Sequence, residues 1–364
     1  MIPGVKSKLA LGSWFKVFYV ILKNMKFLRG TPFDFMAWFS SDVRKADSKA
    51  LNHYKSTITN NLDEIGGLII SEDGKIEAIG KKVNTNNLPS REKPIDLNGK
   101  YIFPGLVDMR VFVGEPGYEY KENFKTLSNS ALSGGVTSVV TMPNTSPVID
   151  NVSIVDFLKR RGRDKSKISV FPTATLTKNL EGKNMTEFGL LQKKGIVGFT
   201  DGVKTIQNTR LMSRIMRSAY DLDSLIMQHA EDFELAENGT VNDGIISTKL
   251  GLQGITELAE KIIIERDLSL LEDFNCRYHI SQISSSKSVE VIKKKKDVVK
   301  FTTGVSINNL SLNENDIGDF RTFLKLSPPL RTEEDRMSLV DAVSYTHLRA
   351  HETEADLVCR LLLE

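Results

Sequence analysis

The hydrophobic and polar positions form a repeating pattern in which short apolar runs alternate with longer amphipathic segments. The runs that predict strands cover residues 101–107, 137–142, 168–174, 195–200, 225–229, 277–283 and 298–303. Helical periodicity covers residues 121–133, 154–160, 209–219, 255–266 and 286–296. Strands that alternate with helices are typical of parallel sheets, and seven such units in one run favour an α/β fold with a (β/α)8 barrel of the TIM type. Only seven strands are found, so we expect a barrel truncated before its last strand.

Four regions follow from the change of pattern along the chain. Residues 1–60 form an extension with no pattern that we can place, and residues 61–100 are expected to be a small β-sandwich portion. In that portion, residues 68–70 and 73–80 predict two short strands around an Asp-Gly turn. Residues 101–343 make up the incomplete barrel. Residues 344–364, which include a Tyr-Thr-His-Leu-Arg-Ala-His-Glu-Thr run, are expected to be a non-native tail because they resemble a translated sequencing adapter.

Composition narrows the class of protein. The chain has 364 residues, 40% hydrophobic and 26% charged, which suits a globular protein with one barrel-sized domain. A net charge of +3 argues against nucleic-acid binding, and the lysine run at 293–296 is expected to be a solvated helix end. Two cysteines are too few for a disulfide framework, which is typical of a reducing compartment. Lysines interrupt the apolar stretch near the N-terminus, so this stretch does not predict a membrane span. We therefore expect a cytoplasmic protein without a membrane span.

Five ordered motifs carry a family resemblance. They are Phe-Pro-Gly-Leu-Val-Asp at 103–108, Glu-Pro-Gly-Tyr-Glu-Tyr-Lys-Glu at 115–122, Met-Pro-Asn-Thr-Ser-Pro-Val-Ile-Asp at 142–150, His-Ala-Glu-Asp at 229–232 and Ser-Pro-Pro-Leu-Arg at 327–331. With them, the chain from about residue 61 to residue 343 resembles dihydroorotases of the long, barrel-plus-sandwich type, within the amidohydrolases. The resemblance implies an active site at the carboxyl ends of the strands, where zinc ions activate a water that opens a cyclic amide.

Several positions depart from what this family carries. Arg110 and Phe112 stand where the resemblance implies two histidine ligands on the first strand, and Gly114 stands in place of an arginine that holds the substrate carboxylate. Gln282 replaces the histidine of the sixth strand, and Asn308 begins an Asn-Asn pair in place of two histidines. The aspartate of the eighth strand, which is the catalytic base of the family, is not found, so no catalytic residue is assigned.

Three family positions are retained. His229 and Asp201 are candidate metal ligands, and Asn144 is a candidate substrate-binding residue. Each also fits another role, since His229 suits a hydrogen-bonded structural histidine, and Asn144 and Arg331 suit the fixing of turns beside prolines. Zinc is the expected cofactor of the family, but one histidine and one aspartate do not make a two-metal site, so we expect none to be bound here.

The function stays open between three hypotheses. The first is a dihydroorotase of pyrimidine biosynthesis, which interconverts dihydroorotate and carbamoyl-aspartate. The second is a non-catalytic dihydroorotase-like subunit that binds aspartate carbamoyltransferase, and the concerted loss of ligands from several strands favours it. The third is another cyclic amidase, similar to a hydantoinase or an allantoinase. In all three, we expect a homo- or hetero-oligomer that binds neither nucleic acid nor a membrane.

Overall fold

The computed structural model describes residues 67–70, 76–80 and 105–344, which fall into two units that divide at residue 104. In the first unit, β1 (Gly67–Ile70) pairs antiparallel with β2 (Ile76–Gly80), with Leu68 opposite Ile79. This confirms the two predicted strands. The turn between them, the rest of the expected sandwich, the 1–60 extension and the tail after Ser344 lie outside the described residues.

In the second unit, parallel strands form the frame that carries the site. They are β3 (Leu106–Val111), β4 (Val136–Thr141), β5 (Ser169–Pro172), β6 (Leu225–Gln228), β9 (Arg277–Ile280) and β10 (Thr302–Thr303). The first three pair in the order β3-β4-β5, and the last three pair in the order β6-β9-β10. Every one of these pairings is parallel, as the alternation of strands with helices predicts.

A short extended segment joins the two groups of strands. Phe199 forms parallel bridges with Ala174 on one side and with Ile226 on the other. Its N–H donates to the Leu225 carbonyl at 2.8 Å, and its own carbonyl accepts from the Met227 N–H at 2.8 Å. The predicted fourth strand is therefore present as a narrow bridge, and the described residues place seven strand positions in one parallel series.

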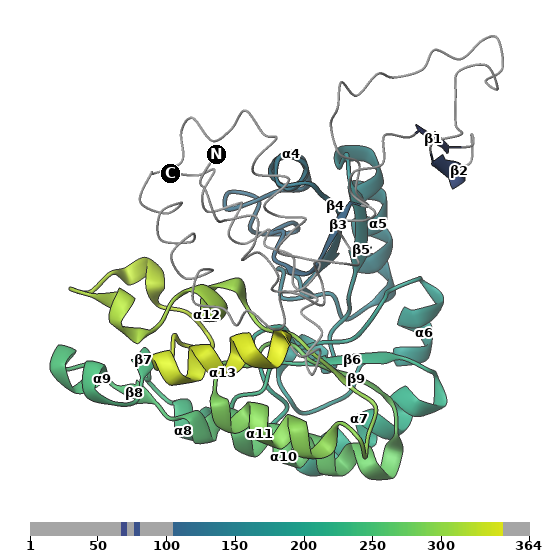
Figure 1. Cartoon of the computed structure of the whole chain (residues 1–364). Helices are drawn as coiled ribbons and strands as arrows, with labels where there is room; N and C mark the ends of the chain where they lie inside the picture. Colours follow the sequence, from purple (N-terminus) through teal and green to yellow (C-terminus); the bar gives the residue numbers. More distant parts are fainter. Residues whose placement is uncertain (1–66, 71–75, 81–104, 345–364) are drawn as a thin grey trace. The chain divides into compact units, whose positions relative to one another are not determined.

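Helices connect the strands. The longer ones are α4 (Phe124–Ser133), α5 (Val152–Lys165), α7 (Thr209–Asp221), α10 (Glu257–Phe274), α11 (Ser286–Lys295) and α13 (Glu333–Ser344), and α6 (Phe188–Lys193) is short. Polar residues begin several of them, since the side chains of Asn123, Asn151 and Ser285 accept from backbone N–H groups of the first turn. Figure 1 shows α10 packed between α7 and α11, with α13 beside α11.

Two segments depart from the simple strand–helix repeat. The first follows β6 and contains α8 (Phe233–Ala236), β7 (Val241–Asn242), α9 (Ile245–Leu250) and β8 (Gly254–Ile255). The second follows β10 and contains α12 (Ile307–Ser311) and two 3-10 turns, η5 (Glu314–Ile317) and η6 (Thr322–Leu324). They share a small apolar cluster of Val241, Ile317, Leu324 and Leu330. The second segment is thereby anchored against the first. A further 3-10 turn, η4 (Lys178–Leu180), follows β5.

Several predicted boundaries are wrong, and three of them bear on the frame of the site. The first barrel strand is predicted at 101–107, of which residues 101–104 lie outside the described residues, and its predicted end is wrong because β3 (Leu106–Val111) continues its pairing with β4 after the apolar run ends. The last predicted strand, 298–303, is reduced to Thr302 and Thr303. The helix predicted from residue 255 starts at Glu257, since Ile255 belongs to β8 and Thr256 is the N-cap.

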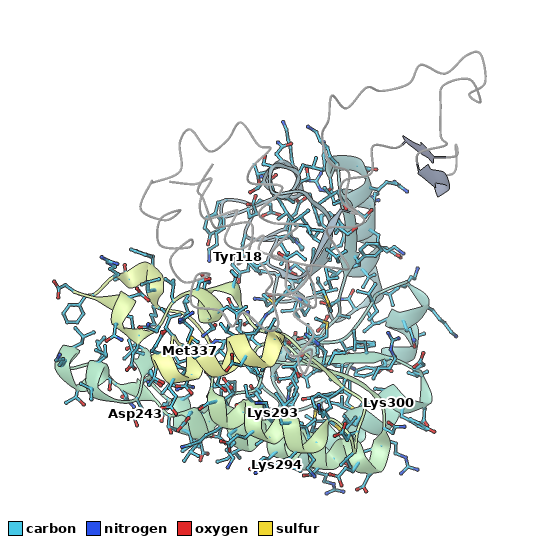
Figure 2. The ribbon with its side chains drawn as sticks, viewed as in Figure 1. Tyr118, Asp243, Lys293, Lys294, Lys300 and Met337 are labelled. Atoms are coloured by element: carbon cyan, nitrogen blue, oxygen red, sulfur yellow. The ribbon has the colours of Figure 1, made fainter. Side chains whose placement is uncertain are left out.

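The lysine run at 293–296 lies at the surface of the protein. Lys293 and Lys294, which Figure 2 labels, are exposed near the end of α11. The lysine run is therefore a solvated helix end, as predicted. Among the described residues, none of the helices is long and apolar enough to cross a membrane.

Candidate functional site

Arg110 occupies the carboxyl end of β3, where the family resemblance implies a metal-binding histidine. Its guanidinium donates from Nη1 to Gln282 Oε1 at 2.6 Å and lies with Nη2 3.5 Å from the Gly202 carbonyl. The Arg110 N–H donates to Asp108 Oδ1 at 3.0 Å. Gln282 follows β9, the sixth strand position, and is 172 residues away in the sequence. Two positions expected to hold separate metal ligands are thus joined to each other by a hydrogen bond.

Phe112 and Gly114 follow on the loop after β3, and neither provides the expected polar group. The Phe112 ring lies 6.0 Å from the Tyr118 ring, centroid to centroid. Figure 2 labels Tyr118 on this loop, where Lys121 Nζ lies 5.3 Å from the centre of the same ring. Gly114 has a φ of +72°, and a Cβ built there would lie 2.7 Å from the carbonyl oxygens of Tyr118 and Glu122. This backbone does not accept an arginine at position 114.

The conformation of Gly114 makes a direct prediction. Gly114→Ala should lower the free energy of unfolding by about 1–3 kcal/mol, because it combines a positive φ with a close approach to two carbonyl oxygens. Urea unfolding of the two proteins measures the difference. Gly189→Ala is the matched control: Gly189 lies in α6 with no atom near the added Cβ, and alanine favours helix. Equal stability of Gly114→Ala and the unaltered protein would contradict the account of this turn.

His229 follows β6 and is fully enclosed, with 1% of its surface exposed. Its Nε2 lies 3.3 Å from the Ser327 hydroxyl and 4.0 Å from Glu231 Oε1, while its Nδ1 has no hydrogen-bond partner in the described structure. Burial lowers the pKa of His229 to about 3, and the positive charge of Arg110 acts in the same direction. The imidazole is therefore neutral at physiological pH.

The carboxylate of Asp201 accepts hydrogen bonds from the neighbouring segment of the chain. Its Oδ1 accepts from the N–H groups of Leu176 and Thr177 at 2.8 and 3.0 Å, and its Oδ2 accepts from the Thr177 hydroxyl at 2.5 Å. Burial raises the pKa of this carboxyl to about 6, against the opposing effect of these donors. The contacts give Asp201 a structural role in holding the segment after β5.

Asn144 and the Asn308-Asn309 pair differ in what they contact. A Cβ built on Gly202 would lie 3.4 Å from Asn144 Cγ, and the buried Oδ1 of Asn144 has no hydrogen-bond partner in the described structure. Asn144 therefore lies beside the same glycine whose carbonyl is near Arg110. Asn308 instead belongs to the first turn of α12, and the buried Asn309 donates from Nδ2 to the Pro329 carbonyl at 3.0 Å.

The sequence did not predict the buried polar network around Arg331. Arg331, 3% exposed, donates to Asn242 Oδ1 at 2.8 Å, to the Ile255 carbonyl at 2.5 Å and to Ser284 Oγ at 3.1 Å. Glu260 accepts from the backbone N–H groups of Ser284 and of the next serine. The network connects the segments after β6, β9 and β10. Its one sequence signal is an arginine that follows Pro-Pro-Leu.

The described residues do not fit the zinc centre that the resemblance implies. A guanidinium, a phenyl ring and two amides stand at four expected ligand positions, and a guanidinium repels a divalent cation. The carboxylate of Asp201 already accepts hydrogen bonds from residues 176 and 177. Of the two retained candidate ligands, His229 is the one with a ring nitrogen, Nδ1, that has no hydrogen-bond partner in the described structure. No group of three or more His, Cys, Asp or Glu within the described ranges is arranged to hold a metal ion.

Comparison with known proteins assigns the family. A model of the Dihydro-orotase-like family matches residues 99–288. The chain is 40% identical over 276 residues to a dihydroorotase of Syntrophus aciditrophicus and 38% identical over 285 residues to one of Ehrlichia canis. These alignments cover 76% and 78% of this chain but 64% and 63% of those relatives. The chain thus spans less than two thirds of their length.

The fold has counterparts among solved structures. An L-hydantoinase from Arthrobacter aurescens aligns with a TM-score of 0.65 and 21% sequence identity, over 76% of this chain and 63% of that one. This agrees with the α/β fold of the parallel strands. The ordered motifs, the matched family model and the sequence identities together lead to one assignment: the chain belongs to the dihydroorotase-like family of the amidohydrolases.

Proposed function

We propose that this chain serves pyrimidine biosynthesis as a dihydroorotase-family protein that does not use a metal centre. Family membership supports the pathway. The single observation that carries the absence of metal chemistry is the hydrogen bond between Arg110 and Gln282, which joins two expected ligand positions. Without a metal ion, no activated water is available to open a cyclic amide by the family's route.

We further propose that its role is that of a non-catalytic partner of aspartate carbamoyltransferase. The described barrel keeps a well-packed frame, with residues such as Phe124, Phe199 and Ile215 fully buried, while four of the expected ligand positions are replaced. A structural subunit needs the fold but not the reactive groups, and this chain keeps the first and has lost several of the second. A hydantoinase- or allantoinase-like amidase needs the same histidines, so the geometry does not favour that alternative.

The partner is tested by co-purification. The full chain is mixed with purified aspartate carbamoyltransferase of the same organism and passed through a size-exclusion column with light-scattering detection. The account predicts one complex of defined stoichiometry that survives treatment with a chelator. Separate elution of the two proteins at micromolar concentrations would contradict the partnership. A histidine-complete dihydroorotase of the same organism, treated in the same way, controls for non-specific association.

A further inference from the structure

Three arginines form a stripe along the exposed face of α7. Arg210, Arg214 and Arg217 follow one another at intervals of four and three residues, so their side chains lie on one face of the helix, and all three are exposed. None of them forms an ion pair with another residue of the described ranges. Tyr220, which follows one turn later, is 59% exposed. Arginine and tyrosine are enriched in protein interfaces, so the stripe has the composition of a contact surface.

A group of exposed apolar side chains lies where α8 meets the start of α10. Leu258 and Ile262 are one turn apart on α10 and are 42% and 43% exposed. The N-cap of α8, Asp232, donates its N–H to the Ala259 carbonyl at 2.9 Å, which fixes α8 against this end of α10. Phe233, the first residue of α8, is 42% exposed. Single exposed apolar residues are ordinary, whereas a group of them marks an interaction site.

The arginine stripe and the apolar group belong to one outer surface and differ in charge. Glu234 and Glu237 are exposed beside the apolar group, and their side chains form no ion pair within the described part of the chain. Arg266, in the middle of α10, donates from Nη1 to the carbonyl of Gln207, just before α7, at 2.9 Å. Since α7 and α10 lead into the parallel strands β6 and β9 and pack side by side (Figure 1), the arginine stripe lies further along α10 than the apolar group.

We propose that this surface binds a second copy of the chain. The surface carries a basic part and an acidic, apolar part, so it is complementary to itself. A two-fold axis places the arginine stripe of each copy on the acidic, apolar part of the other, and every contact forms twice. Opposite charges then face each other, and the apolar side chains of α8 and α10 lose their contact with water. The inference does not rest on the proposed function, because it involves neither a ligand nor the carbamoyltransferase.

Analytical ultracentrifugation of the full chain alone, at concentrations from about 1 to 100 µM, tests this proposal. We expect a dimer whose dissociation constant rises as salt is added. Arg214→Glu and Glu234→Arg should each weaken the dimer on the order of 10-fold or more, because like charges then face each other. An equimolar mixture of these two variants should form a heterodimer, since each altered residue then meets an opposite charge on the other copy. Restoration by mixing also excludes misfolding of either variant.

Two further variants complete the test. Ile262→Gln keeps a good helix former on α10 but removes the apolar contact, so it should weaken the dimer at an unchanged melting temperature. Lys125→Glu makes the same reversal of charge at an exposed position of α4, well away from α7 in Figure 1, and should leave the dimer unchanged. A monomer at every concentration, or a mixture that does not associate, would overturn the inference. Loss of the aspartate carbamoyltransferase complex by Arg214→Glu, with self-association intact, would overturn it in favour of that partner.

Discussion

Replacing Arg331 with methionine should lower the free energy of unfolding by about 3–5 kcal/mol, the range for breaking a buried charged network by removing one member. Methionine fills a similar volume but donates no hydrogen bond. The carbonyl of Ile255, the amide oxygen of Asn242 and the hydroxyl of Ser284 would lose their donor. The carboxylate of Glu260, which is 2% exposed, would also lose a nearby positive charge. Urea unfolding followed by circular dichroism measures the loss.

The control for this prediction is the same substitution at the surface. Arg163 forms an exposed ion pair with the neighbouring Asp164, and the side chain of Arg163 is 76% exposed. Arg163→Met should change the free energy of unfolding by no more than about 0.5 kcal/mol, as expected for surface positions. Similar losses of unfolding free energy in the two variants would show that the hydrogen bonds of Arg331 do not stabilise the fold.

Replacing Phe199 with alanine should lower the free energy of unfolding by about 3–5 kcal/mol, the usual cost of deleting a buried aromatic ring. Phe199 is 1% exposed and stacks on Phe188 with 3.8 Å between ring centroids. Its backbone also joins β6 to the segment after β5. The deletion therefore creates a cavity at the point where the two groups of strands meet.

Thermal and urea unfolding of Phe199→Ala should be compared with Phe323→Ala. The Phe323 side chain is 62% exposed, so its truncation removes little buried surface and should cost no more than about 0.5 kcal/mol. A loss of less than about 1 kcal/mol for Phe199→Ala would contradict the described position of the fourth strand between its two neighbours.

Much of the barrel frame could be predicted from the chain because its longer helices carry clear periodicity and polar caps. The predicted helix 209–219 and the observed helix α7 begin at the same residue, Thr209, which follows the N-cap Asn208. The short helices α6, α9 and α12 have six residues or fewer, too few for a periodic signal. The end of β3 was misplaced for a related reason, since Asp108 and Arg110 interrupt the apolar run although the strand continues.

The candidate site was predictable only in part. The replaced positions Arg110, Phe112, Gly114, Gln282 and Asn308 were recognisable from the motifs around them. The bond between Arg110 and Gln282 was not, because it joins residues 172 positions apart and depends on how the parallel strands are arranged in space. For the same reason, the contacts of Arg331 with Asn242 and Ser284 could not be predicted from the sequence.

With Arg110 and Gln282 at expected ligand positions, this family member is proposed to work without a metal ion. Elemental analysis of the purified full chain, grown with added zinc and assayed in parallel for ring opening of dihydroorotate, is the decisive measurement. The account predicts far less than one zinc per chain, no turnover above the uncatalysed rate, and a melting temperature that a chelator does not change. Stoichiometric zinc together with turnover that the chelator abolishes would contradict it.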